Sequence, residues 1–155
     1  MIFDADPVHI EHIGSTSVPG LCAKPVLDIL VGAQSLAAVT CRTAKLEEAG
    51  YLYRPEYEAE IPDRRYFVRP AASQPRVHVH AVVQGGALWL THLAFRDALR
   101  SSPELSREYA TLKRQLAAQY REDKAAYTEA KSPFIARVVA NALSTRRSAA
   151  ATGGA

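Results

Sequence analysis

The chain has 155 residues, of which 48% are hydrophobic and 23% are charged, with a net charge of +3. These values are typical of one globular domain, and two cysteines outside any CxxC pair exclude a disulfide framework or a zinc site. The absence of a long apolar run or a signal-peptide pattern predicts a cytoplasmic protein without a membrane partner. The mild basicity suits a phosphate-bearing ligand and is too weak to predict nucleic acid as a partner.

In the first half of the chain, predicted strands alternate with loops. An apolar run at residues 25–31, bounded by proline and glycine, predicts a buried central strand. Ser35 is expected to cap a single helix over residues 35–49, with Gly50 at the position that follows a helix end. The other predicted strands are residues 8–13, 51–53, 65–68 and 77–83.

The second half is predicted to be helical. Ser102 and Pro103 begin one helix that ends near residue 120, and it lies between predicted helices at 87–100 and 124–143. A break is expected in the last helix at Pro133. Strands followed by helices predict an α+β fold over residues 1–143, and the small, polar residues 144–155 predict a disordered tail.

A loop follows the first predicted strand and contains Gly14 and Ser15. Glycine allows the backbone to approach a ligand closely, and the serine hydroxyl with free backbone N–H groups can form an anion-binding nest. Lys24 could add a mobile positive charge. The alternative is a tight turn that only connects two strands.

Asp28 lies inside the apolar run of the central strand, on the face opposite to its odd-numbered neighbours. A buried carboxylate costs several kcal/mol unless it is paired, hydrogen-bonded or bound to metal. Asp28 is therefore a candidate metal ligand or catalytic residue. The alternative is a structural carboxylate that caps the neighbouring loop.

The sequence GSTSVPG at residues 14–20, followed by AKP and by DI at Asp28, resembles the signature of the GrpB family. Further matching motifs are HVH at 78–80, HLAFRD at 92–97, PELSREYATLK at 103–113 and AYTEAKSPFI at 126–135. Together these motifs span most of residues 10–140. The combined match is much more specific than any single motif.

This resemblance implies a nucleotidyltransferase-like fold, a mixed β-sheet with helices and a C-terminal helical segment. In that superfamily a Gly-Ser loop holds the nucleotide phosphates, and two carboxylates on the next strand hold Mg²⁺. Asp28 takes one carboxylate place, and Val26 or Leu30 occupies the other. One carboxylate is therefore missing, and Mg²⁺ would depend mainly on the phosphates of the substrate.

His78 and His80 share one face of their strand, which is where the superfamily has its third carboxylate. With Asp28 they could form a set of two histidines and one carboxylate, and imidazoles prefer transition metals to Mg²⁺. Alternatively, both histidines only hydrogen-bond to neighbours or to ligand phosphates. Glu11 or His12 must also face the same way as Asp28.

Three functions follow as hypotheses. The first is transfer of a nucleotidyl or phosphoryl group from a nucleoside triphosphate, with Mg²⁺ or Mn²⁺ on Asp28. The second is a non-catalytic nucleotide- or coenzyme-binding module, because GrpB-like domains also occur fused to dephospho-CoA kinase. The third is a metal-dependent hydrolase. The catalytic candidates are Asp28, His78 and His80, and the phosphate-binding candidates are Gly14, Ser15, Thr16, Lys24 and Lys131.

Overall fold

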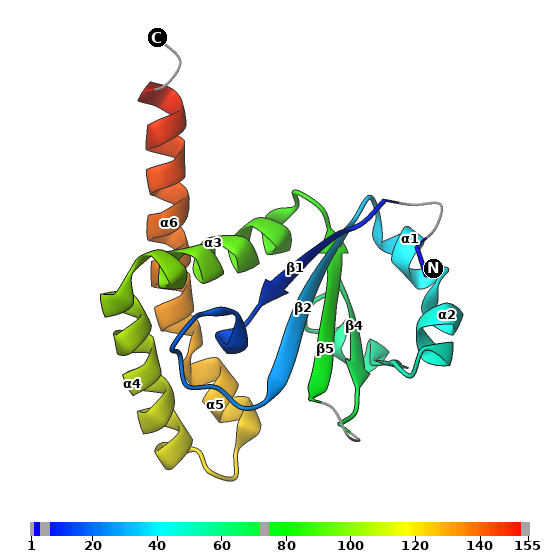
Figure 1. Cartoon of the computed structure of the whole chain (residues 1–155), viewed down its shortest axis with the longest axis horizontal. Coiled ribbons are helices and arrows are strands. Elements are labelled where there is room, and N and C mark those ends of the chain that lie inside the picture. The colour runs from blue at the N-terminus through cyan, green and yellow to red at the C-terminus, as the bar shows by residue number, and fades with distance from the viewer. Residues whose placement is uncertain (1, 4–6, 72–74, 153–155) are drawn as a thin grey trace. The chain divides into compact units, whose positions relative to one another are not determined.

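Five strands form one mixed sheet in the order β1-β2-β5-β4-β3 (Figure 1). The central strands β2 and β5 are parallel, and the other neighbours pair antiparallel. The structure is a computed structural model in which residues 2–3, 7–71 and 75–152 are described. The strands are β1 His9–Ile13, β2 Val26–Ala33, β3 Leu52–Tyr53, β4 Arg64–Arg69 and β5 Arg76–Val83.

The chain divides into two compact units. The first comprises Met1–Ser17 and Ala23–His92 and contains the whole sheet. The second comprises Val18–Cys22 and Leu93–Ala155 and is mainly helical. The predicted α+β class with a mixed sheet and C-terminal helices is confirmed, whereas the single domain over residues 1–143 stays a prediction.

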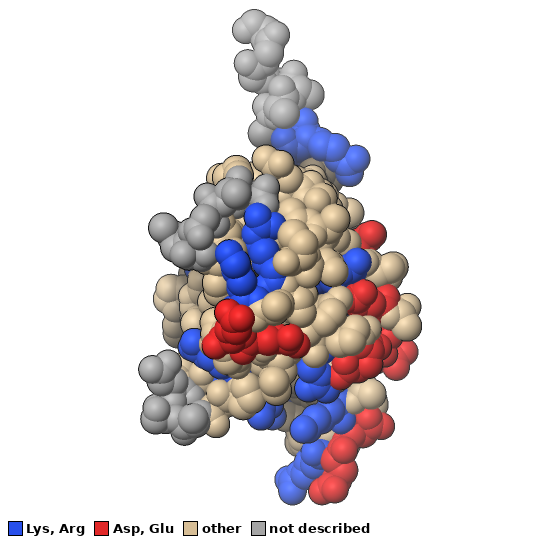
Figure 2. All heavy atoms as spheres, turned by 90° about the vertical axis from the view of Figure 1, so that its right-hand side faces the viewer, with Lys and Arg blue, Asp and Glu red and all other residues tan. Residues whose placement is uncertain are grey.

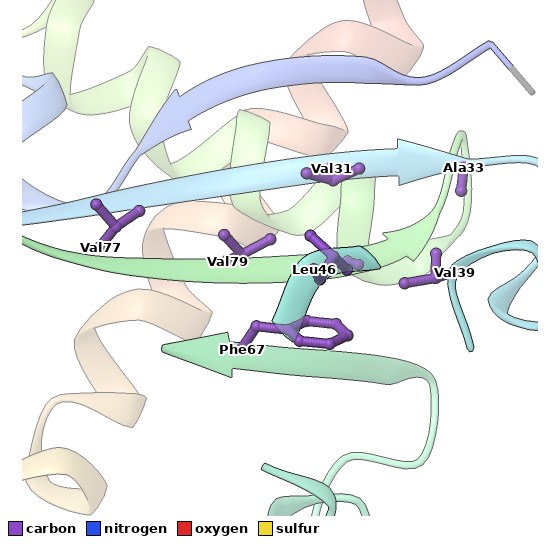
Figure 3. Close-up of a cluster of buried hydrophobic side chains, with 8 residues drawn as sticks. Val31, Ala33, Val39, Leu46, Phe67, Val77 and Val79 are labelled. Atoms are coloured by element: carbon purple, nitrogen blue, oxygen red, sulfur yellow. The ribbon is translucent and has the colours of Figure 1, made fainter. Parts of the chain in front are cut away.

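One face of the sheet carries the core of the first unit (Figure 3). Side chains alternate along each strand, so Val31 of β2, Val79 of β5 and Phe67 of β4 point to the same face. They pack against Val39 of α1 (Leu36–Thr40) and Leu46 of α2 (Thr43–Glu48), and all five side chains are buried. The even-numbered residues of β2, β4 and β5, Asp28 among them, therefore occupy the opposite face.

The single helix predicted at residues 35–49 is wrong, because the chain forms α1 Leu36–Thr40 and α2 Thr43–Glu48. Ser35 caps α1 as expected, and its Oγ accepts the backbone N–H of Ala38 at 3.2 Å. The break arises at Arg42, whose guanidinium donates to the carbonyl of Ala38 at 2.8 Å. The backbone N–H of Arg42 turns instead to Val39, as in a 3₁₀ turn.

The helices that follow are α3 Ala87–Ser101, α4 Pro103–Gln119, α5 Lys124–Ala130 and α6 Ser132–Thr152. Ser102 caps α4 by accepting the N–H of Leu105 at 3.2 Å, and the expected break before Pro133 separates α5 from α6. The helix α6 continues to Thr152, which differs from the disordered tail predicted at 144–155. Alanine and arginine favour helix there, and residues 153–155 lie outside the described part.

The second unit has its own aromatic core. Phe134 of α6 stacks on Tyr109 of α4 with ring centroids 5.2 Å apart. Phe95 of α3 meets both rings edge-on, at 5.2 Å from Tyr109 and 6.4 Å from Phe134. Val18 and Leu21, which precede β2 in the chain, are buried in the same cluster.

The charged surface agrees with the composition. Acidic and basic side chains lie close together on the face drawn in Figure 2, where no broad patch of a single sign is visible. Such mixing differs from the clustered basic stripe of a nucleic-acid-binding surface. Among the described residues, no helix is long and apolar enough to cross a membrane.

Candidate functional site

The two central strands bring three side chains with metal-ligand chemistry together. Parallel pairing places Asp28 directly opposite His78, and Leu30 opposite His80. Asp28 Oδ1 lies 3.2 Å from His78 Nδ1 and 3.6 Å from His80 Nε2. One ligand atom from each residue lies within 4.8 Å of the others, the only such group found among the described residues.

The electrostatics of Asp28 show how this cluster is held together. Burial alone would raise the pKa of its carboxyl group, but hydrogen-bonding and charge interactions with His78 and His80 together outweigh burial and keep that pKa well below its ordinary value. Burial also lowers the pKa of His80, which favours the neutral imidazole. A charged carboxylate beside the neutral imidazole of His80 is the protonation state that a metal requires of these two ligands.

These residues fit a transition metal better than Mg²⁺. Two imidazole nitrogens and one carboxylate oxygen are the donor set of the two-histidine, one-carboxylate sites, whereas Mg²⁺ prefers oxygen ligands and water. Val26 and Leu30 flank Asp28 on the same face and offer no donor. Glu11, opposite Leu30 on β1, shares the face but lies outside the three-residue cluster.

The turn after β1 lies directly against Asp28. Gly14 has φ of +70°, and a Cβ built there would lie 2.3 Å from Asp28 Oδ2. Only glycine therefore fits, both for its backbone conformation and for the close approach. The predicted Gly-Ser turn and the predicted carboxylate are thus brought together, because β1 pairs with β2 and places Ile13 opposite Asp28.

Hydrogen bonds from the side chains of Ser17 and Thr16 hold this turn in place. Ser17, which is buried, donates its hydroxyl to the carbonyl of Gly14 at 2.7 Å. Thr16 donates to the carbonyl of Val26 at 3.0 Å and lies 3.0 Å from His12 Nε2. The hydroxyl of Thr16, a predicted phosphate ligand, is therefore used inside the chain. Ser15 is half-buried at the start of the turn.

The structure adds three residues that the motif reasoning did not assign to the site. Tyr66 of β4 lies opposite His80, with its ring 5.1 Å from that of His80. Arg64, on the same face of β4, places Nη1 3.4 Å from His80 Nδ1. His92 at the start of α3 lies 5.7 Å from the His80 ring, and burial lowers its pKa to about 4. Period-two spacing puts Arg64 and Tyr66 on one face of β4, but only the pairing with β5 shows that this face meets His80.

The two predicted phosphate-binding lysines are not part of this cluster. Lys24 is exposed in the loop that leads into β2. Lys131 belongs to the second unit, where it ends α5 and its Nζ lies 4.4 Å from the centre of the Tyr127 ring. Arg96 and Asp97 form an ion pair at 2.8 Å in that unit.

Comparison with known proteins identifies relatives over most of the chain. The family model described as GrpB protein matches residues 1–141. A UPF0157 protein, YqkA of Bacillus subtilis, is 38% identical over 142 residues, covering 92% of this chain and 40% of that protein. A UPF0157 protein of Deinococcus radiodurans is 42% identical, covering 85% of this chain and 66% of its own length. The chain thus spans less than two thirds of both relatives.

A solved structure agrees with the fold. The GrpB protein of Enterococcus faecalis is 35% identical, with a TM-score of 0.80, and the match covers 94% of this chain and 86% of that one. A dephospho-CoA kinase of Mycolicibacterium paratuberculosis is also similar. It is 30% identical over 149 residues, and the match covers 82% of this chain and 37% of that kinase.

Proposed function

This chain belongs to the GrpB family, and on that premise we propose that it is a metal-dependent enzyme that transfers a nucleotidyl or phosphoryl group from a nucleoside triphosphate to a small acceptor, with pyrophosphate or a nucleoside diphosphate as the leaving group. A first-row transition metal, in preference to Mg²⁺, is held by Asp28, His78 and His80. The observation that carries the proposal is the convergence of three ligand atoms within 4.8 Å on adjacent strands. The family's likeness to nucleotidyltransferases supports the reaction class, by analogy of fold.

Each residue of the site has a part in this proposal. The bound metal supplies positive charge that offsets the charge of the transferring phosphate group. Asp28 and the two histidines would hold the metal on the central strands of the sheet. Gly14 has no side chain, so the backbone of its turn can lie directly against Asp28. In this proposal Ser15, at the start of this turn, contributes its hydroxyl to the binding of phosphate oxygens.

The test is metal affinity and nucleotide turnover in the same preparations. We expect wild type to bind one equivalent of Mn²⁺, Co²⁺ or Zn²⁺ by calorimetry after chelator treatment, and to bind Mg²⁺ much more weakly. Asp28→Asn and His78→Ala each remove a metal ligand. Loss of a residue that only hydrogen-bonds to a ligand weakens metal binding roughly 10–100-fold, so we expect these two variants to lose more affinity than that. His9→Ala, an exposed histidine of the same sheet, is the control.

Turnover of a panel of nucleoside triphosphates should require the metal and should be lost in Asp28→Asn and His78→Ala but not in His9→Ala. Wild type that takes up no transition metal, or His78→Ala that binds metal as tightly as wild type, contradicts the metal centre. Tight metal binding without turnover of any nucleotide contradicts the transferase part alone.

The similarity to a dephospho-CoA kinase favours a second candidate, a non-catalytic module that binds a nucleotide or coenzyme A near that enzyme. This candidate expects dephospho-CoA or coenzyme A to raise the melting temperature. A ligand at about a hundred times its Kd stabilises by about 2.7 kcal/mol. The shift should persist with chelator and in His78→Ala, without product on long incubation, whereas a metal-dependent shift favours the enzyme.

A further inference from the structure

Arg64 is a charged side chain beside the candidate metal cluster without a compensating charge. Its guanidinium lies 4.8 Å from the centre of the Tyr66 ring, and its Nη1 lies 3.4 Å from His80 Nδ1. Its Nε is buried and has no hydrogen-bond partner among the described residues. None of the ion pairs found in that part of the chain involves Arg64.

A partly buried guanidinium without an ion pair lowers the stability of the folded protein unless a ligand pairs with it. Burial lowers the pKa of Arg64, yet arginine stays charged in proteins, so the guanidinium remains a partly desolvated cation. The carboxylate of the candidate cluster, Asp28, is engaged by His78 and His80. Glu60 acts on Arg64 electrostatically but forms no ion pair with it.

The neighbouring residue Arg65 shows what a compensated arginine looks like on the same strand. Its side chain lies on the opposite face of β4, where Nη1 pairs with Glu58 at 3.2 Å and Nε donates to Thr40 at 3.2 Å. Both arginines are partly buried, so burial alone does not distinguish them. The difference is that the site face provides Arg64 with an imidazole and an aromatic ring instead of a carboxylate.

We propose that Arg64 is the anion-binding residue of this site and takes a phosphate group of the ligand through its guanidinium. The inference rests on the proposed function for the identity of the ligand, and it deepens that function by naming the residue that receives the phosphate. The planar fork of arginine matches two phosphate oxygens, and the unsatisfied Nε–H shows that the surrounding residues do not use all the donors of this guanidinium.

The contact with His80 links Arg64 to the metal ligands. Arginine can only donate, so Nδ1 of His80 accepts from Arg64, and Nε2 carries the hydrogen that faces Asp28. His80 can offer Nε2 to a metal only with its hydrogen on Nδ1, where it meets the N–H of Arg64. Arg64 is then released toward an anion, so metal and phosphate should each favour binding of the other.

The experiment is binding of inorganic phosphate to chelator-treated protein, followed by ³¹P NMR. Arg64→Gln removes the charge and the fork, and Arg65→Gln is the matched control on the other face of the strand. A hydrogen bond to a charged group contributes about 1.5–3 kcal/mol, so we expect phosphate to bind roughly 10–100-fold more weakly to Arg64→Gln. Arg65→Gln should bind phosphate as wild type does.

Folding of the variant is checked separately by thermal unfolding. Arg64→Gln removes a partly buried charge that forms no ion pair with a described residue, so its melting temperature should equal or exceed that of wild type. Arg64→Lys, which keeps the charge but loses the fork, should show an intermediate affinity and serves if the glutamine variant is unstable. Equal phosphate affinity in wild type and Arg64→Gln overturns the proposal, as does an equal loss in the Arg64 and Arg65 variants.

A second measurement separates this inference from the proposed function. Arg64 is not a metal ligand and its N–H opposes the metal-binding tautomer of His80, so Arg64→Gln should bind metal at least as tightly as wild type when no anion is present. If wild type binds no metal but binds phosphate through Arg64, the metal-dependent enzyme fails and the anion site stands. If metal binds as proposed and phosphate ignores Arg64, the anion site alone fails.

Discussion

At the scale of single residues, Gly14 is the position where the turn depends most directly on the identity of the amino acid. Its φ of +70° is unfavourable for other residues by about 1–2 kcal/mol. A Cβ would also overlap Asp28 Oδ2 at 2.3 Å, so the carboxylate would have to move. We expect Gly14→Ala to lower the free energy of unfolding by more than 2 kcal/mol, and to weaken metal binding at Asp28.

Gly20 provides the control for this prediction within the same loop. Its φ of +74° imposes the same backbone strain, but nothing lies within 4 Å of a Cβ built there. Gly20→Ala should therefore cost about 1–2 kcal/mol and leave metal affinity unchanged. Denaturant unfolding and calorimetry measure both quantities. Equal effects of the two substitutions on both would show that the approach of Gly14 to Asp28 does not matter.

Sequence reasoning at this scale identified residue types and faces but not distances. Alternation along two apolar strands was enough to predict that His78 and His80 share a face, and that Asp28 lies on the face opposite to its odd-numbered neighbours. Arg64 was missed because nothing in its local sequence distinguishes it from Arg65. Only the strand pairing shows that Arg64 faces His80 and that Arg65 faces Thr40 and Glu58.

At the scale of elements, the site is a consequence of the register between β2 and β5. These strands are separated by α1, α2, β3 and β4 along the chain, and they lie side by side in parallel. A shift of one residue in this pairing would turn either Asp28 or the histidines to the core face. The sequence predicts which side chains share a face within a strand, whereas convergence depends on pairing that is set by the packing of the whole sheet.

Because Gly32 of β2 has no side chain, the start of α3 can approach the sheet closely at this position. A Cβ at Gly32 would lie 2.6 Å from Cζ3 of Trp89, which is buried against the strand. We expect Gly32→Ala to force Trp89 away and to cost about 1–3 kcal/mol, as overpacking of a core does. Chemical denaturation of the variant measures this cost.

A double-mutant cycle tests whether that cost comes from contact with Trp89. Trp89→Leu leaves space beside the strand, so Gly32→Ala should cost less in the Trp89→Leu background than in wild type. The coupling should be about 0.5–3 kcal/mol, the usual range for residues in contact. Additive costs would place the effect of Gly32→Ala in the strand backbone rather than in its packing against the helix.

At the scale of the whole molecule, strands in the first half and helices in the second predicted the α+β class. The predicted helix boundaries were wrong where a side chain competed with the backbone for a hydrogen bond. At Arg42 the guanidinium donates to the carbonyl of Ala38, and α1 ends there. The polar composition of residues 144–155 predicted a disordered tail. The alanines and arginines of that segment also favour helix, and α6 extends to Thr152.

The division into two units leads to the last prediction. Asp28, His78, His80 and Arg64 all belong to the first unit, whereas the Phe134 ring stacks on Tyr109 within the second. Phe134→Leu removes aromatic contacts from the core of the second unit and should cost about 1–3 kcal/mol of stability. Because no residue of the site belongs to that core, metal and phosphate affinities should stay within twofold of wild type, roughly the error of such comparisons.

Hydrogen exchange distinguishes a local effect of Phe134→Leu from a global one. We expect faster exchange in α4 and α6 and unchanged protection in β2 and β5, because local opening draws on the contacts within each unit. Calorimetry on the same sample gives the metal affinity. If protection in β2 and β5 falls together with metal affinity, the second unit supports the site, and the ligand set of the first unit is insufficient for binding by itself.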